Sequence, residues 1–167
     1  LSTEQIDLAA RHLLAARKAH KPGPGIPSAF RPDEADSALA IQERVLALSG
    51  DTVGGWKCGL PNAAGLLISP IGASAILRSS PCKVPGAKGQ IEPEIAFVLA
   101  HDLPARATPY TAEEIRGAIA ESRLVLELIT TRYADKASAS PAEILADSYN
   151  NHGLLLGPVS QIGRATA

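Results

Sequence analysis

The sequence predicts an α+β fold, in which a small helical N-terminal layer to about residue 50 leads into a β-rich domain over residues 51–167. Two observations indicate this class. Apolar residues recur at helical spacing within the first 50 residues, whereas the later apolar segments are short and are separated by turns rich in Gly and Pro. A length of 167 residues suits one core, and 46% hydrophobic with 20% charged residues is ordinary globular usage.

The helices are predicted from their N-terminal signals. Ser or Thr followed three residues later by Gln or Glu is the capping-box pattern, and it occurs at Ser2, Thr111 and Ser140. Pro141 at the first helical position strengthens the last of these signals. The predicted helices run from Ser2 to before Gly23, from about Asp33 to Leu48, from Thr111 to about Glu121 and from Ser140 to about Asp147.

The strands are predicted from short apolar segments bounded by turn residues. Ile91–Ala100 is the clearest of them, and Leu124–Thr130 reads as a buried strand. The predicted strands are Val53–Leu60, a short one near Ala75–Leu77, Ile91–Ala100, Leu124–Thr130 and Gly153–Leu156, which Pro158 closes.

Charge and composition exclude several classes of partner. A formal net charge of -1 gives no electrostatic reason to bind nucleic acid or an anionic membrane. No apolar segment approaches the roughly 20 residues of a membrane-spanning helix. Cys58 and Cys82 have no metal-binding or redox spacing and read as reduced thiols. We therefore expect a cytoplasmic protein without nucleic-acid or membrane partners.

Three glutamates lie in strands that are otherwise apolar. Glu92 and Glu94 are two residues apart, so both side chains should point to the same face, and Pro93 between them suits a sheet edge or a bulge. Glu127 interrupts an apolar strand, where a lone carboxylate needs a partner. Three carboxylates with room left for water and substrate match what Mg²⁺ or Mn²⁺ prefers. We therefore predict that Glu92, Glu94 and Glu127 bind one such cation.

A simpler alternative remains open at this stage. Glu92 and Glu94 could lie on a solvated edge, and Glu127 could pair with Arg123 or Arg132.

Further residues are candidates for the chemistry of a site. Lys57 lies between Trp56 and Cys58, so it could be partly desolvated and serve as a general acid or base, or it could be an ordinary surface lysine. Trp56 could form the wall of a pocket. Three polar residues follow the last predicted helix and could contact substrate oxygens or simply form a capped turn: Asp147, Ser148 and Asn150.

Several segments together resemble a known enzyme group. They are Gly55-Trp56-Lys57-Cys58-Gly59-Leu60, Ile91-Glu92-Pro93-Glu94-Ile95-Ala96-Phe97, Leu126-Glu127-Leu128 and Ala146-Asp147-Ser148, in that order. This pattern resembles the 2-keto-4-pentenoate hydratase / 4-oxalocrotonate decarboxylase group of the fumarylacetoacetate hydrolase superfamily. The resemblance implies a mixed β-roll or barrel, a metal held by the carboxylates at positions 92, 94 and 127, and an acid/base lysine at position 57.

The sequence departs from this group in two respects. The loop after the lysine strand reads Ser69-Pro70-Ile71-Gly72, where an acidic residue is common in the group. Members of the group also continue through further strands, whereas this sequence stops at Ala167. A sheet that stopped there would leave apolar faces open. We therefore expect a roll that is C-terminally incomplete, covered either by a further segment or by another subunit of a homo-oligomer.

The resemblance implies a divalent-metal-dependent lyase, either a hydratase or a decarboxylase. Its substrates would be small 2-hydroxy-dienoic or 2-oxo-enedioic acids from the degradation of aromatic compounds. One alternative is a carbon–carbon hydrolase of acylpyruvates, which is disfavoured because no His stands near a Glu in the first helix-to-strand region. Another is a catalytically degenerate member that binds a partner lyase, which the missing loop carboxylate favours.

Overall fold

The computed structural model describes residues 1–59, 68–83 and 89–160, and it combines helices with two β-sheets, as the sequence predicts. The elements follow one another in the order α1 (Thr3–Ala19), η1 (Ser28–Phe30), α2 (Ala35–Ser49), β1 (Val53–Cys58), β2 (Ile68–Gly72), η2 (Ala73–Ala75), β3 (Ile76–Leu77), β4 (Gln90–Leu99), α3 (Ala112–Ala118), β5 (Ile119–Ile129), η3 (Lys136–Ser138), α4 (Pro141–Ala146), η4 (Ser148–Asn150) and β6 (Asn151–Ser160).

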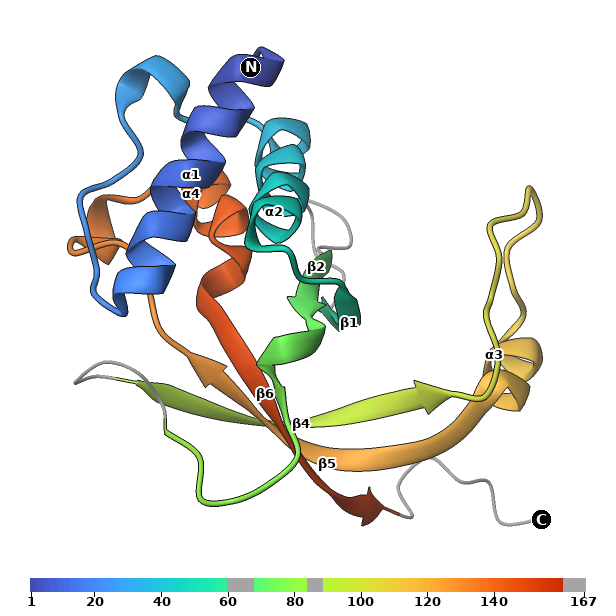
Figure 1. Cartoon of the computed structure of the whole chain (residues 1–167). Helices are drawn as coiled ribbons and strands as arrows, with labels where there is room; N and C mark the ends of the chain where they lie inside the picture. Colours follow the sequence, from blue (N-terminus) through green and yellow to red (C-terminus); the bar gives the residue numbers. More distant parts are fainter. Residues whose placement is uncertain (60–67, 84–88, 161–167) are drawn as a thin grey trace.

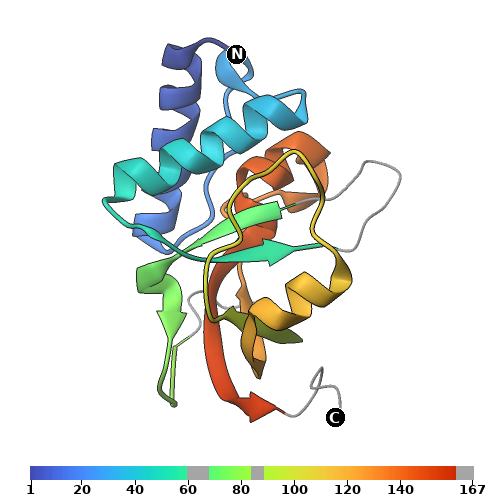
Figure 2. The ribbon, with the colours of Figure 1, turned by 90° about the vertical axis from the view of Figure 1, so that its right-hand side faces the viewer.

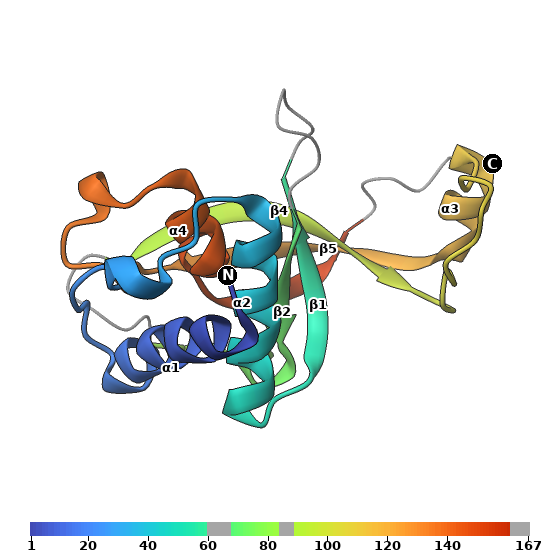
Figure 3. The same cartoon turned by 90° about the horizontal axis from the view of Figure 1, so that it is seen from above.

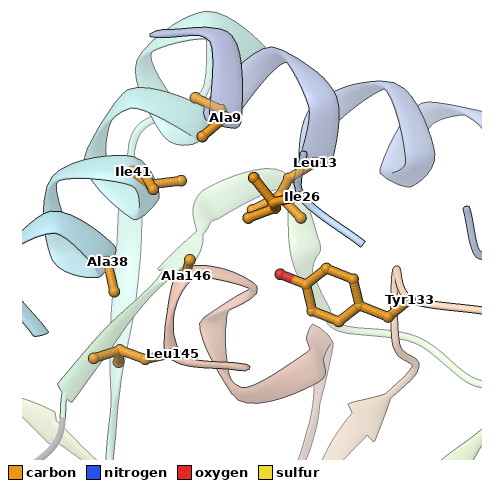
Figure 4. Close-up of a cluster of buried hydrophobic side chains, with 9 residues drawn as sticks. Ala9, Leu13, Ile26, Ala38, Ile41, Tyr133, Leu145 and Ala146 are labelled. Carbon is orange, nitrogen blue, oxygen red and sulfur yellow. The ribbon is translucent and has the colours of Figure 1, made fainter. Parts of the chain in front are cut away.

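Helices α1, α2 and α4 gather at one end of the molecule (Figure 1). The predicted capping boxes are present at the start of α1 and α4, where the Ser2 and Ser140 side chains accept hydrogen bonds from the backbone N–H three residues on. Figure 4 shows the core that these helices share. Its buried members are Ala9, Ala10, Leu13, Ile26, Ala38, Ile41, Tyr133, Leu145 and Ala146. The helical layer therefore includes α4 and Tyr133 as well as the first 50 residues.

The larger sheet has the strand order β3-β6-β5-β4 among the described residues. β3 pairs with β6 in parallel, and the other neighbours are antiparallel. β4 lies at an edge, as expected for a strand that contains Pro93. Within the described ranges the strands do not close into a barrel.

β1 and β2 form a separate antiparallel ribbon between α2 and the larger sheet (Figures 1 and 2). The view from above shows this ribbon beside α2, with α3 at the far end of β5, away from the helical layer (Figure 3). The ribbon is therefore placed to bring side chains of β1 over the larger sheet.

Two strands differ by several residues from their predicted bounds, β2 was not predicted, and the predicted end of the first strand at Leu60 lies outside the described residues. β5 begins at Ile119 instead of Leu124, because α3 already ends at Ala118 and pairing with β4 carries the strand through polar residues. β6 runs through Pro158, which we expected to close it. Pro158 lies where the register with β5 is irregular, a position at which the missing N–H costs no ladder hydrogen bond.

One face of the edge strand is apolar and exposed. Ile91, Ile95 and Phe97 alternate along β4, and exposed Leu124 of β5 lies opposite Ile95. Contiguous apolar surface of this kind commonly marks an interface. The homo-oligomer stays a prediction, and this exposed apolar face is a physical reason to expect it. Among the described helices, none has both the length and the hydrophobicity that crossing a membrane requires.

Candidate metal centre

The three predicted glutamates come together at the β4–β5 pair. One carboxylate oxygen from each of Glu92, Glu94 and Glu127 lies within 4.8 Å of the others. The strand register explains this proximity, because Glu92 lies directly opposite Glu127 and Glu94 is two residues further along the same face. Like charges that face each other across a strand pair are destabilising. This arrangement therefore favours a positive charge among the three carboxylates.

Lys57 supplies one such charge from the β1–β2 ribbon. Its Nζ donates a hydrogen bond to Oε2 of Glu127 over 2.6 Å, and the two side chains are 17% and 1% exposed. Asn151 donates from Nδ2 to Oε1 of the same carboxylate over 2.8 Å. Both oxygens of Glu127 thus accept a hydrogen bond while keeping a further lone pair each.

The alternative in which an arginine pairs with Glu127 is wrong. Arg123 forms an ion pair with Glu121, and Arg132 forms one with Asp147. Glu127 is buried and contacts Lys57 instead. The other part of that alternative, a solvated edge, agrees with the exposure of Glu92 on the edge strand β4, whereas Glu94 is half-buried.

Helix α2 fixes the ribbon that carries Lys57. Ser69 of β2 lies opposite Lys57 and donates to Oε1 of Gln42 over 3.2 Å, and the Gln42 amide also donates to the backbone carbonyl of Leu145. Trp56 is the neighbour of Lys57 in β1, so its side chain points to the other face, where it is 56% exposed. Trp56 is therefore not among the residues that the structure brings to the carboxylates.

A tight turn before β6 places Asn151. Ser148, Tyr149 and Asn150 have φ values of 52°, 51° and 62°, in the left-handed region that costs non-glycine residues roughly 1–2 kcal/mol each. The turn is held because Asn150 donates its N–H to the carbonyl of Asp147 over 2.9 Å, and its own carbonyl accepts from Thr130 over 3.0 Å.

The three polar residues predicted to contact substrate lie in or next to this turn, and none of them is among the carboxylate ligands or their hydrogen-bond partners. Asp147 is buried and accepts hydrogen bonds from the backbone and the guanidinium of Arg132. Burial raises the pKa of Asp147, and the charge of Arg132 opposes that rise. Asn150 is buried, and Ser148 lines a cavity beside β6. Their contacts with substrate stay predictions.

The neighbour Asn151 is the residue that sequence reasoning missed. Its role depends on the turn and on the register of β6. The Asn-Asn pair just before an apolar strand is the sequence signal that could have indicated it.

Burial and neighbouring negative charges both change the pKa of a carboxyl group at this centre. Burial raises the pKa of Glu94, the negative charge of Glu127 raises it further, and Lys57 offsets part of the effect. One lysine thus faces three glutamates, and a divalent cation would offset the remaining negative charge.

The residues present fit such a cation. Ligand oxygens of Mg²⁺ lie about 2.0–2.1 Å from the ion and those of Ca²⁺ about 2.3–2.6 Å, so two oxygens of one shell are at most about 4.2 Å apart around Mg²⁺ and about 5.2 Å apart around Ca²⁺. The three glutamate oxygens lie within 4.8 Å of one another, inside the Ca²⁺ limit, and a shift of a few tenths of an ångström brings them within the Mg²⁺ limit. Their chemistry, oxygen without sulfur or imidazole, is that of sites for Mg²⁺, Mn²⁺ and Ca²⁺.

No protein-family model matches the sequence, and no curated protein matches it significantly. Solved structures with the same fold include 4-oxalocrotonate decarboxylase from Pseudomonas putida G7. In complex with magnesium and adipate it has a TM-score of 0.74 and 18% identity over 94% of this chain and 64% of that chain. In complex with calcium and acetate it has a TM-score of 0.72 and 19% identity over 94% of this chain and 63% of that chain.

The chain therefore has the fold of this decarboxylase and spans about 64% of its length. The fold type that the sequence resemblance implies is thereby confirmed.

Proposed function

We propose that this chain belongs to the 2-keto-4-pentenoate hydratase / 4-oxalocrotonate decarboxylase group and acts as a divalent-metal-dependent lyase. Its substrates would be small 2-hydroxy-dienoic or 2-oxo-enedioic acids. The observation that carries the proposal is the convergence of three glutamate oxygens within 4.8 Å, with Lys57 bonded to the buried one. The fold neighbour, a decarboxylase complexed with magnesium and the dicarboxylate adipate, supports it.

In this proposal Glu92, Glu94 and Glu127 hold Mg²⁺ or Mn²⁺. When bound, the cation supplies a Lewis acid that stabilises negative charge at the C2 oxygen of a 2-oxo acid. Asn151 and Lys57 fix the carboxylate of Glu127 through both of its oxygens, so the ligand set is oriented before a cation arrives.

Lys57 is the proposed acid/base group. Its ammonium is mostly withdrawn from solvent and is held in a fixed orientation 2.6 Å from Glu127. Lys57 would donate or accept a proton at the carbon chain of a substrate held beside it.

A second candidate function is a binding partner that lacks turnover. It is favoured by the residue opposite Lys57 in the β1–β2 register, which is Ser69 and not a carboxylate. Ser69 already donates to Gln42, so it is engaged in holding the ribbon.

Metal binding is the first test. Calorimetric titration of the metal-free chain with MgCl₂ should give one site, and Glu94→Gln should weaken binding at least roughly tenfold while leaving the fold unchanged by circular dichroism. Glu43→Gln, at an exposed position of α2, is the matched control and should bind like wild type. Equal affinities of wild type and Glu94→Gln would place any Mg²⁺ site elsewhere.

Turnover is the second test and separates the chemistries. Release of CO₂ from 2-oxo-hex-3-enedioate marks a decarboxylase, and loss of dienol absorbance from 2-hydroxypentadienoate marks a hydratase. Lys57→Met should lower kcat by at least roughly a hundredfold if Lys57 transfers protons. Mg²⁺ binding without either activity would favour the binding-partner function, and a kcat within twofold of wild type would assign Lys57 to scaffolding.

A further inference from the structure

A cavity of about 360 Å³, the one that Ser148 lines, lies where the C-terminal ends of α1 and α2 meet β2 and the start of β6. Basic side chains line it from separate parts of the chain: Arg17, His20, Lys83 and His152. Neither the three glutamates of the metal centre nor Lys57 lines this cavity. It is therefore a separate site, although Asn151 contributes to both.

The positive charge of Arg17 is incompletely balanced. Among the described residues its acidic partner is Asp147, whose Oδ1 lies 4.0 Å from Nη2 of Arg17 and which already pairs closely with Arg132. Two guanidinium groups thus share one carboxylate. Nε of Arg17 is buried and has no hydrogen-bond partner within the part of the chain that the structure describes. The described residues therefore do not satisfy all the donors of this guanidinium, which lines the cavity.

The acidic side chain in the wall of the cavity does not supply the missing charge. Asp51 accepts from the Ser74 hydroxyl over 2.7 Å and from the backbone N–H of Thr52 over 2.9 Å. These bonds keep its carboxylate at the turn before β1 and lower its pKa. The basic side chains therefore outnumber the acidic one in the wall, even with both histidines neutral.

Two imidazoles in the wall lie beside Arg17. The rings of His20 and His152 are edge to face with their centroids 6.1 Å apart. Burial, followed by the charges of Arg17 and Arg132, lowers the pKa of His152 to about 4. Burial and the charge of Arg132 lower the pKa of Arg17 to about 10, against the opposing charge of Asp147. An anion beside these groups would oppose the part of each shift that comes from the neighbouring positive charges.

We propose that this cavity binds a small oxyanion, a carboxylate or a phosphate-type group, through Arg17, with His20 and His152 beside it. The guanidinium offers paired donors that match the oxygens of such an anion. A volume of about 360 Å³ admits an anion with several further heavy atoms. The site goes beyond the proposed lyase function and needs no divalent cation, so it is testable in metal-free protein.

Calorimetry on metal-free protein in EDTA-free buffer, with sulfate and with malonate titrated separately at low ionic strength, tests the site. We expect saturable binding of at least one anion at one site per chain. Tighter sulfate binding would identify a tetrahedral anion as the ligand type, and tighter malonate binding a carboxylate. Arg17→Met should weaken binding roughly tenfold or more, whereas Arg11→Met, on the exposed side of the same helix, should not.

An NMR titration of the wild-type imidazoles supplies a measurement that does not depend on how Arg17→Met folds. A bound anion should raise the pKa of His152 from about 4, because a nearby negative charge favours the imidazolium. The imidazole of His12, which lies against the carbonyl of Pro24 on the exposed face of α1, is the internal control. Absence of saturable binding by both anions, equal affinity of Arg17→Met, or an unchanged His152 pKa would each overturn the proposal.

Discussion

Replacing Lys57 with methionine removes the ammonium that contacts Glu127 and leaves a carboxylate that is 1% exposed beside two other glutamates. Of its described hydrogen bonds, Glu127 would retain the one from Asn151. Methionine keeps much of the length and apolar volume of the lysine stem, so the change is mainly one of charge. We expect a large loss of stability in the metal-free chain.

The magnitude follows from the burial of the pair. Removing one partner of a buried ion pair costs about 3–5 kcal/mol, because the remaining charge is left without compensation. Lys57 is itself 17% exposed, so water already reaches it and the lower end applies, about 3 kcal/mol. For a chain of this size a loss of that amount lowers Tm by roughly 6–12 °C.

Urea unfolding followed by circular dichroism in EDTA measures this loss. Adding Glu127→Gln to Lys57→Met removes the orphaned charge and should recover most of the lost stability, which a double-mutant cycle reports as a coupling energy. Arg11→Met breaks an exposed pair with Asp7 and should cost no more than about 0.5 kcal/mol. If Lys57→Met costs as little as Arg11→Met, the contact between Lys57 and Glu127 is not a buried ion pair.

Other predictions concern pH and stability. Because the pKa of Glu94 is raised on folding, this residue contributes stability below its ordinary pKa of 4.5 that is lost as pH rises through the folded value. Glu94→Gln should flatten that loss in urea unfolding from pH 4 to 8 in EDTA, and an unchanged slope would contradict the assignment. Gly153→Ala would place its Cβ 2.6 Å from the carbonyl oxygen of Ala75 and should cost about 1–3 kcal/mol in thermal unfolding, because backbone must move. Ser140→Ala removes the side-chain cap of the Glu143 N–H and should cost about 1 kcal/mol in the same assay, without changing Mg²⁺ affinity. If Gly153→Ala or Ser140→Ala has the same Tm as wild type, the contact described for that residue is contradicted.

Local rules of sequence account for part of the candidate centre. The alternation of side chains in a strand was enough to put Glu92 and Glu94 on one face, and Pro93 indicated an edge. The apolar neighbours of Glu127 showed that it needed a partner. In the same way, the capping patterns at Ser2 and Ser140 marked helix starts that the structure contains.

Partners distant in sequence could not be derived from local rules. The contact between Lys57 and Glu127 spans 70 residues and depends on how the β1–β2 ribbon crosses the larger sheet. Resemblance implied roles for both residues but no contact between them, and the alternative partners Arg123 and Arg132 form ion pairs with Glu121 and Asp147 instead. Asn151 was missed because three successive left-handed residues, which no propensity favours, determine where its side chain points.

The position of β4 at the edge of the sheet has a consequence for the lifetime of anything bound there. Among the described strands it pairs with β5 alone, so its separation from the sheet breaks one ladder instead of two. Edge opening of this kind belongs to the low-energy fluctuations of a folded protein. Each such opening carries Glu92 and Glu94 away from Glu127, and a ligand held by all three is then released. By linkage, the same ligand suppresses the opening in proportion to its occupancy, so dissociation and fraying of the strand are one coupled event.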